Sequence, residues 1–350
     1  MRTVIVLGAA FAAIAPAATS QAAQRYTVAG DNVAIYNLAG VVRVEGGPAG
    51  DVVVEVTRLG DAAAKLQVET GPIGSRQTLR VIYPDDDIVY PGMGAHSSSN
   101  LDVRDDGTFS GDNRSFGRGH RVRISGDGSG LDAHADLRIL VPPGRRIAVY
   151  LAVGRMTATN VDGDVKLDVS SADVTASGTK GSLSVDAGSG DVRVTDAIGD
   201  LNLDTGSGNV VVSGAHGDDL LFDTGSGDVT IDHAEGRSLK IDTGSGNADA
   251  TAVKADDLVI DTGSGDVTLE LLSGGSSIDI DTGSGEVNLT LPAEYGADVV
   301  LDTGSGDIDL GGISVTVRKI AEDHVEGRIG SGTGRLHVET GSGDVRLKKA

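Results

Sequence analysis

A short motif that recurs at a nearly fixed interval constrains this chain more than any other feature. It appears eight times, and six copies begin Asp-Thr-Gly-Ser-Gly. The copies start at Asp186, Asp204, Asp223, Asp242, Asp261, Asp281, Asp302 and Glu339. The first six intervals are 18, 19, 19, 19, 20 and 21 residues, and the last is 37. A period of this length indicates one structural unit that is stacked on itself.

Apolar and polar residues alternate on both sides of the glycines, which is the pattern of half-buried strands. The positions one and three before the acidic residue, and six and eight after it, are apolar in all eight copies. These four columns predict the interior of a solenoid. We expect two of them to contain Leu201, Leu220, Leu239 and Leu258, and Leu203, Phe222, Ile241 and Ile260, respectively.

The fourth copy is unusual because it carries Ala248 and Ala250 where other copies have larger side chains. Since protein interiors pack densely, this coil should be pinched, with Ala252 and Val253 turned inward to help fill it.

Gly-Ser-Gly predicts a tight corner, because glycine adopts positive φ at little cost. A second corner follows the second strand, so each coil reads strand, corner, strand, corner. The sequence therefore predicts an all-β fold, a parallel β-solenoid (β-helix) with about 19-residue two-strand coils. The outward positions carry Asp, Thr, Lys, Arg, Asn and Ser, as a solvated surface should. A meander of antiparallel hairpins is the alternative, but one identical corner per period favours the solenoid.

The rest of the chain predicts a division into three parts. Residues 1–22 form a signal peptide, residues 23–134 an irregular N-terminal β region, and residues 135–350 the solenoid repeats. Residues 85–133 are rich in Gly, Ser, Asp and Asn, which predicts a long mobile insertion that buries little. Residues 311–335 interrupt the repeats and should complete one irregular coil, since 37 is close to two periods.

The signal peptide is predicted from Arg2, an apolar run over residues 4–15, and the cleavage-site sequence Ser20-Gln21-Ala22. The run is shorter than the roughly 18 residues that a membrane span needs. We therefore expect an exported protein, periplasmic or extracellular, with no membrane span after signal cleavage. The chain has no cysteine, so stability must come from stacking and backbone pairing.

The formal net charge is −22. Acidity of this size argues against nucleic acid and anionic membrane surfaces as partners, and favours cations or basic partners.

Three stretches together resemble the bacterial adhesin-like family of β-strand-repeat proteins. They are the motif copies continued by Asp-Val, the sequence Leu140-Val141-Pro142-Pro143-Gly144 that enters the repeats, and the ending Thr340-Gly341-Ser342-Gly343-Asp344-Val345-Arg346-Leu347. Members are exported and largely of unassigned function, so the resemblance implies a role at the cell envelope. The insertion at residues 85–133 departs from the family pattern.

Asp-Thr-Gly-Ser also surrounds the catalytic carboxylate of aspartic proteases, which need two such loops face to face. Copies spaced one coil apart along one edge do not build that pair. Calcium is a stronger alternative, because repeated carboxylates suit a hard cation. Its candidate ligands are Asp204, Asp223, Asp242, Asp261, Asp281 and Asp302. The known calcium repeat is nine residues long, so we expect no cofactor, and instead that each Asp accepts hydrogen bonds from its own corner.

Two further groups of residues were considered as sites. His216 and His233 follow adjacent repeats and could approach each other, although exposed turn residues are the simpler interpretation. The insertion carries a mildly basic group that is either a contact site or solvated loop: Arg104, Arg114, Arg118, His120 and Arg121.

These observations favour a non-enzymatic exported envelope protein, an adhesin-like β-solenoid whose repetitive polar surface contacts an envelope protein or a glycan. No nucleophile–base pair or phosphate loop stands out. The alternatives are a carbohydrate-active β-helix enzyme, which needs larger coils and a side cleft, and a calcium-binding structural repeat protein. The sequence names neither the partner nor the oligomeric state.

Overall fold

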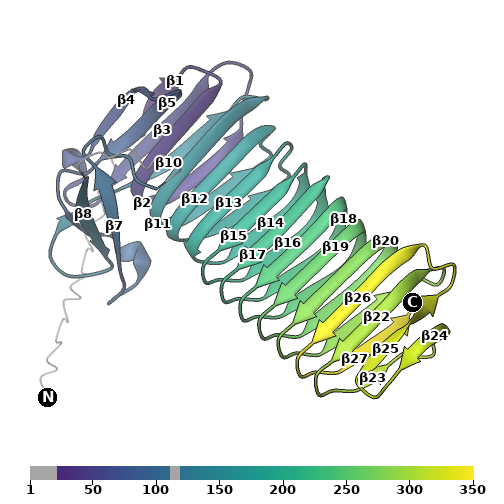
Figure 1. Cartoon of the computed structure of the whole chain (residues 1–350). Coiled ribbons are helices and arrows are strands. Elements are labelled where there is room, and N and C mark those ends of the chain that lie inside the picture. Colours follow the sequence, from purple (N-terminus) through teal and green to yellow (C-terminus); the bar gives the residue numbers. More distant parts are fainter. Residues whose placement is uncertain (1–21, 111–118) are drawn as a thin grey trace, which may run out of the picture.

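The structure, a computed structural model, describes residues 22–110 and 119–350 as a long rod with a wider N-terminal end (Figure 1). The described residues are strands and loops, with two 3-10 turns, η1 (Ala63–Lys65) and η2 (Pro91–Met93). No helix in this described part is long and apolar enough to cross a membrane. The expected signal peptide, residues 1–22, lies almost wholly outside the described residues.

The strands run across the rod and stack along its length. Each coil contributes one extended segment before its Gly-Ser-Gly corner and another after it, and each segment pairs with the equivalent segment of the next coil. We call the sheets that these segments build the first sheet and the second sheet. The strands are β11 (Arg145–Thr159), β12 (Gly163–Ser177), β13 (Leu183–Ser189), β14 (Val192–Ile198), β15 (Leu201–Thr205), β16 (Val210–His216), β17 (Asp219–Thr224), β18 (Val229–Thr243), β19 (Ala248–Thr262), β20 (Val267–Thr282) and β21 (Val287–Leu291). Pairing along this series is parallel throughout, so the fold is all-β and solenoid-like.

The two expected interior columns are confirmed. Leu201, Leu220, Leu239 and Leu258 pair in register, as do Leu203, Phe222, Ile241 and Ile260. All eight side chains are at most 1% exposed. Like residues therefore stack on like residues, and the repeat in the sequence is a repeat of the core.

The motif threonine belongs to the interior, although threonine was expected among the outward, solvated residues. Seven such threonines are buried and donate a hydrogen bond, 2.9–3.2 Å long, to a glycine carbonyl of the neighbouring coil. Thr243, for example, donates to the oxygen of Gly227. The hydroxyl is satisfied by this bond, which allows a polar residue to lie in the core.

One residue per coil of the second sheet lies in the left-handed region. Asn160, Gly178, Asp196, Gly214, His233 and Ala252 have φ between 50° and 71°. Each is followed, directly or one residue later, by a residue of the interior, such as Ala197, Ala215 and Ala234. The kink therefore shifts the alternation of inward and outward side chains by one residue. It brings the next side chain into the core, which is alanine in three coils and valine or threonine in the others.

Ala252→Gly is expected to stabilise the rod by about 1 kcal/mol, because alanine is strained at a φ of 54° and glycine is not. Chemical denaturation measures the change. The control is Ala248→Gly, at a buried extended position, which should destabilise by about 1 kcal/mol. A less stable Ala252→Gly protein would contradict the strain argument.

The pinch expected beside Ala248 and Ala250 is half right. Val253 is fully buried, but Ala252 is only partly covered. Pairing between β19 and β20 shifts register between Ala250 and Val253. An irregularity of pairing, rather than two inward side chains, accommodates the small residues.

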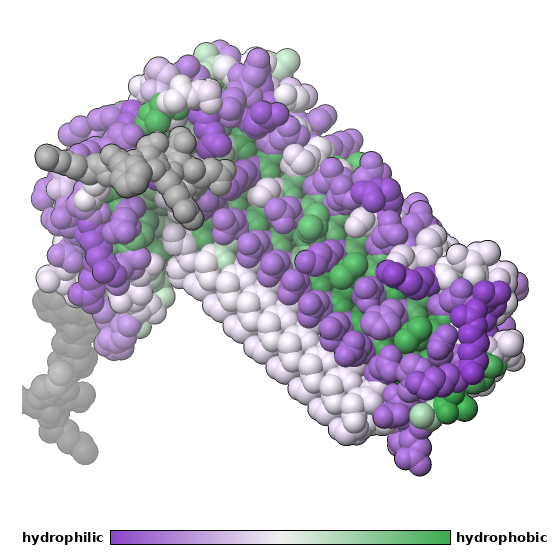
Figure 2. Space-filling view, viewed as in Figure 1, coloured by the Kyte–Doolittle hydropathy of each residue, from purple (hydrophilic) through white to green (hydrophobic). Residues whose placement is uncertain are grey.

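Apart from Gly190 of the first copy, with a φ of 134°, the glycines of the Gly-Ser-Gly corners do not use positive φ, contrary to the sequence argument. From Gly206 to Gly265, the first and third residues of each motif corner lie outside the left-handed region. Glycine is needed at both positions because a Cβ atom would collide with the neighbouring coil. At Gly246 this Cβ would lie 1.9 Å from the carbonyl oxygen of Gly227. Figure 2 shows the resulting pale band of small residues along one edge of the rod.

Parallel stacking reaches back to the N-terminal region. β2 (Asn32–Gly46) pairs in parallel with β11 over most of its length. Around it lie β1 (Gln24–Val28), β3 (Val52–Leu59), β4 (Gln67–Ile73), β5 (Arg76–Ile82) and β10 (His134–Val141). Antiparallel pairs such as β1–β3 and β4–β5 widen this end of the rod.

The described part of the insertion is not a mobile, unburied loop. Residues 85–110 and 119–133 form a separate small sheet of four strands: β6 (Asp87–Val89), β7 (Ser98–Arg104), β8 (Gly119–Ser125) and β9 (Leu131–Asp132). Ile88, Val103, Phe109, Val122 and Ile124 are buried. Few but regularly alternating apolar residues thus suffice to fold a Gly/Ser-rich stretch.

The C-terminal end is intercalated, which corrects the expected irregular coil. The strands are β22 (Ala297–Thr303), β23 (Ile308–Asp309), β24 (Val315–Ile320), β25 (His324–Ile329), β26 (Gly334–Thr340) and β27 (Val345–Lys349). β26 pairs in parallel with both β20 and β22, and β27 pairs with both β21 and β23. The chain thus leaves a gap one coil wide, forms the antiparallel β24–β25 hairpin, and returns to fill the gap with its last repeat.

Candidate functional site

A column of acidic residues runs along the outer face of the first sheet. Consecutive pairs in register join Asp168, Asp186, Asp204, Asp223, Asp242, Asp261, Asp281, Glu339 and Asp302. Strands of a sheet lie about 4.8 Å apart, so one carboxylate follows the next at that step. All six residues predicted from the sequence as the calcium alternative lie in this column, which we call the acidic column.

The acidic column is under electrostatic strain. Burial, and then the carboxylates of Asp223 and Asp186, raise the pKa of Asp204. Burial and the neighbouring Asp242 and Asp281 likewise raise the pKa of Asp261, although Lys240 opposes the effect. Like charges one strand apart disfavour ionisation of one another. The column therefore favours protons, cations or cationic partners.

Three basic side chains of the described residues meet the acidic column. Lys166 Nζ lies 3.9 Å from Asp168 Oδ2. Lys240 Nζ lies 3.4 Å from Asp242 Oδ2, and His324 Nδ1 lies 2.5 Å from Asp302 Oδ1. The Lys240 contact is about half exposed on both sides, so it contributes little stability on its own.

A second ladder stabilises the corners. It begins at Asp173, which follows Ser-Ser-Ala, and then uses the residue that follows each Gly-Ser-Gly. In each coil its side-chain oxygen accepts a hydrogen bond of 2.8–3.2 Å from the backbone N–H of the next coil. The ladder runs through Asp173, Asp191, Asn209, Asp228, Asn247, Asp266 and Glu286. Asn alternates with Asp in its centre, which halves the charge there.

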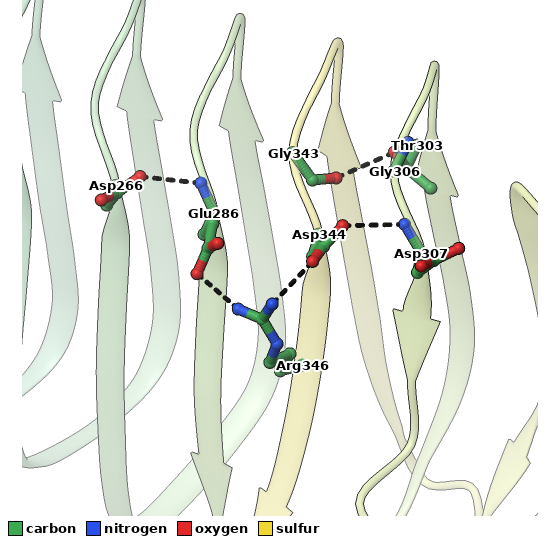
Figure 3. A network of polar contacts seen from close by, with 8 residues as sticks. All are labelled: Asp266, Glu286, Thr303, Gly306, Asp307, Gly343, Asp344 and Arg346. Atoms are coloured by element: carbon green, nitrogen blue, oxygen red, sulfur yellow. Dashed lines mark hydrogen bonds and ion pairs between the residues drawn. The ribbon is translucent and has the colours of Figure 1, made fainter.

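Figure 3 shows this ladder at the intercalated end. Glu286 donates its N–H to Asp266, and Asp307 donates its N–H to Asp344. Between them Arg346 bonds Glu286 and Asp344. Its cation thus joins β27 to the coil before it.

We expected the motif Asp to accept hydrogen bonds from the N–H groups of its own corner. The corner is instead stabilised by bonds to the neighbouring coil. Corner N–H groups bond the neighbouring coil: Gly244 N donates to Thr224 O, and Asn247 N donates to Asp228 Oδ1. The acidic column is left on the outer face, beyond these bonds.

The geometry does not converge on a metal or a catalytic pair in the part of the chain that is described. No group of three or more His, Asp or Glu side chains there is arranged to hold a metal ion. The motif aspartates follow one another along parallel strands, and two facing loops of the aspartic-protease kind do not occur among these paired repeats.

Asp204→Asn is expected to raise the melting temperature at pH 7. A carboxyl whose pKa is raised in the folded protein stabilises the fold most at pH values below its pKa in the unfolded chain. This stabilisation is lost as the pH rises through the pKa in the folded protein. Acidification from about pH 7 toward pH 4 should therefore stabilise the wild type, and the variant should respond less. Thermal unfolding at several pH values tests this, with Asp249→Asn of the second sheet as control. An equal pH response in both variants would exclude strain in the column.

The other residue groups considered from the sequence do not form shared sites. His216 pairs in register with Glu235 and lies 3.9 Å from it, whereas His233 Nδ1 lies 2.7 Å from Asp232. The two imidazoles thus contact separate carboxylates.

The basic group of the insertion is only partly described. Arg114 and Arg118 lie outside the described residues. Arg104 donates to Thr108, His120 lies 3.3 Å from Asp86, and Arg121 pairs across the sheet with Asp102. Arg104 and His120 thus contact nearby loop residues, and Arg121 lies opposite Asp102 in the pairing of β7 with β8.

Residues 176–348 match the protein family described as Toastrack DUF4097. This match confirms the resemblance to adhesin-like β-strand-repeat proteins that the motif copies suggest. No curated protein matches the chain.

Among solved structures, a candidate cell adhesion protein from Clostridium sporogenes aligns with 94% of this chain and 100% of its own, at 11% identity and a TM-score of 0.21. At that score the alignment supports no conclusion about shape or activity.

Proposed function

We propose that this chain, whose residues 176–348 match the Toastrack family, is a non-enzymatic exported protein that presents a repetitive polar surface for contact with a protein or glycan. The proposal includes an adhesin-like role in the periplasm or outside the cell, and a scaffold of about 19-residue coils with two short strands each. The observation that carries it is the acidic column: nine acidic residues in register, all but the buried Asp168 open to solvent on one outer face.

A repeated charge suits a repeated partner. Each coil offers a similar weak contact, and linked weak contacts add up to avidity when the partner is itself a polymer. The acidic column favours a cationic partner, such as a lysine-rich protein segment or an amino-sugar polymer. The strain in the column supports this choice, because a cationic partner relieves it.

The test compares two variants of equal net charge. Asp223→Asn with Asp242→Asn removes two carboxylates from the acidic column, and Asp232→Asn with Asp249→Asn removes two from the second sheet. We expect the first pair to weaken binding of a lysine-rich peptide or an oligoglucosamine several-fold, and the second pair to leave it nearly unchanged. Equal weakening would mean that only net charge matters and would contradict a specific face.

We further propose that the acidic column binds no specific calcium ion. Each carboxylate comes from a separate coil, and calcium needs six to eight oxygens around one point. Calorimetry of the metal-stripped protein tests this. Calcium and magnesium should give similar, small shifts of the melting temperature, in the wild type and in Asp242→Asn alike. A saturable calcium shift that Asp242→Asn abolishes would establish the calcium alternative.

A further inference from the structure

A groove on the outer face of the first sheet, near the wider end of the rod, combines three cationic side chains with neutral polar groups. Its volume is about 330 Å³. It is lined by Asn32, Arg76, Arg146, Ile147, Ala148, Asp164, Val165, Lys166, Ser182 and Ser184. None of these residues was considered as a site from the sequence, because they come from β2, β5, β11, β12 and β13 and from the loop before β13.

The cations reach the groove from three strands. Arg146 of β11 is the register partner of Asp164 on β12, and Ala148 is that of Lys166. The small side chain of Ala148 leaves the floor open beside Lys166. Arg76 enters from β5, at the start of the strand that follows the β4–β5 turn.

Arg76 is held in place by a neutral group. Its Nη1 donates to the phenol oxygen of Tyr150 over 2.8 Å. Tyr150 stacks on Tyr36 with ring centroids 4.4 Å apart, and Phe109 covers both rings edge-on. An aromatic cluster therefore fixes the guanidinium without cancelling its charge.

The remaining groups of the groove suit hydroxyls. Ser182 donates to Asp164 over 3.0 Å, Arg146 lies 3.6 Å from the same carboxylate, and Ser184 lies beside Lys166 in register. Lys166 also lies 3.9 Å from Asp168 at the end of the acidic column, so three cations meet two carboxylates, and the groove keeps a net positive charge in a chain of net charge −22.

We propose that this groove binds a small acidic sugar, with its carboxylate on Arg76 and Lys166 and its hydroxyls toward Asp164, Ser182 and Ser184. A guanidinium recognises a carboxylate through paired N–H donors. Asp164 accepts hydrogen bonds from sugar hydroxyls but repels a phosphate dianion. The volume lies at the lower end of the range for small-molecule sites, which suits one sugar ring or two. The groove adjoins the acidic column only at Asp168, which lies 3.9 Å from Lys166, and the other members of the column do not line it.

Calorimetric titration of the full chain with glucuronate, glucose and inorganic phosphate tests the proposal. Glucuronate should bind with a Kd on the order of 1 mM, as expected for a ligand of this size. Glucose and phosphate should each bind at least ten-fold more weakly. Phosphate binding as tight as that of glucuronate would show a general anion site, and equal binding of glucose would show that the cations play no part; either result overturns the proposal.

Variants locate the binding. Arg76→Gln and Lys166→Gln should each weaken glucuronate binding at least ten-fold, whereas Arg193→Gln, exposed on the second sheet, should not. If Arg76→Gln lowers the melting temperature by disturbing the tyrosines, the affinity of Lys166→Gln for glucuronate alone tests whether the groove is the binding site. Unchanged glucuronate affinity in Lys166→Gln would overturn the assignment. Both variants should still bind the lysine-rich peptide, which separates this site from the acidic column.

Discussion

Replacing Gly246 by alanine is expected to destabilise the rod by about 3 kcal/mol, the upper range for forced overpacking. The new Cβ would lie 1.9 Å from the carbonyl oxygen of Gly227 and 3.1 Å from Oγ1 of Thr243. The obstacle is backbone, and both coils are fixed by ladders on either side of the corner. The clash can be relieved only by parting the coils.

The matched control is Ser245→Ala, between the same two glycines and exposed. Its effect should stay within about 0.5 kcal/mol, as for most surface substitutions. Urea denaturation of the two variants provides the comparison. Equal stability of Gly246→Ala and Ser245→Ala would show that the corner has room for a side chain.

Removing residues 334–350 is expected to melt the C-terminal end of the rod and leave the rest folded. The deletion takes away β26 and β27, and with them the only partners that join β22 and β23 to the preceding coils in the described structure. Repeat proteins lose stability locally, because each unit contacts mainly its neighbours. Hydrogen exchange should show loss of protection over residues 297–329 and retention over residues 165–262.

Deletion of Lys349 and Ala350 alone is the control, since it leaves β26 and nearly all of β27 in place. It should preserve protection throughout. Retained protection of β22 and β25 after the longer deletion would mean that β22 pairs directly with β20, and that the last repeat is not needed to hold the end.

Much of the fold follows from the apolar columns alone. Because a side chain in a strand faces in or out with a period of two, eight copies of one pattern determine which residues stack. The same alternation, continued by one step from Leu201 and Leu203, reaches Thr205. The phase of the alternation therefore places this threonine inside, although its hydroxyl group is typical of an exposed residue.

Two other features of the fold, the left-handed kink and the intercalated last repeat, are harder to recognise in the sequence. The left-handed kink is occupied by Asn, Gly, Asp, His and Ala, which share no single chemistry, although Asn, Asp and His tolerate that conformation better than most residues. The intercalated last repeat is a matter of topology. An interval of 37 residues is long enough for two successive coils. It is equally long enough for a hairpin followed by a strand that returns to pair between two earlier coils.

The candidate sites divide in the same way. The acidic column was predictable, because it is one motif position repeated in register. The groove beside Arg76 was not, since its residues are spread from Asn32 to Ser184. The one available signal was local: Arg146 and Lys166 occupy positions where later coils carry Ser182 and Ser184.

A rod shortened by two coils tests most directly whether the repeated face is the contact surface. Deleting residues 206–243 joins Thr205 to Gly244 and restores an intact Thr-Gly-Ser-Gly corner. It places Leu201 and Leu203 against Leu258 and Ile260, and Asp191 beside Asn247. The protein should therefore fold, with Asp223 and Asp242 gone from the acidic column.

Binding of a surface-attached polymeric oligoglucosamine is then compared between the full and the shortened rod. If each coil adds a weak contact, affinity should fall several-fold without being lost, and the remaining binding should still weaken as salt is added. Unchanged affinity, or its complete loss in a rod that is still folded, would place recognition at a single site and contradict a repeated contact surface.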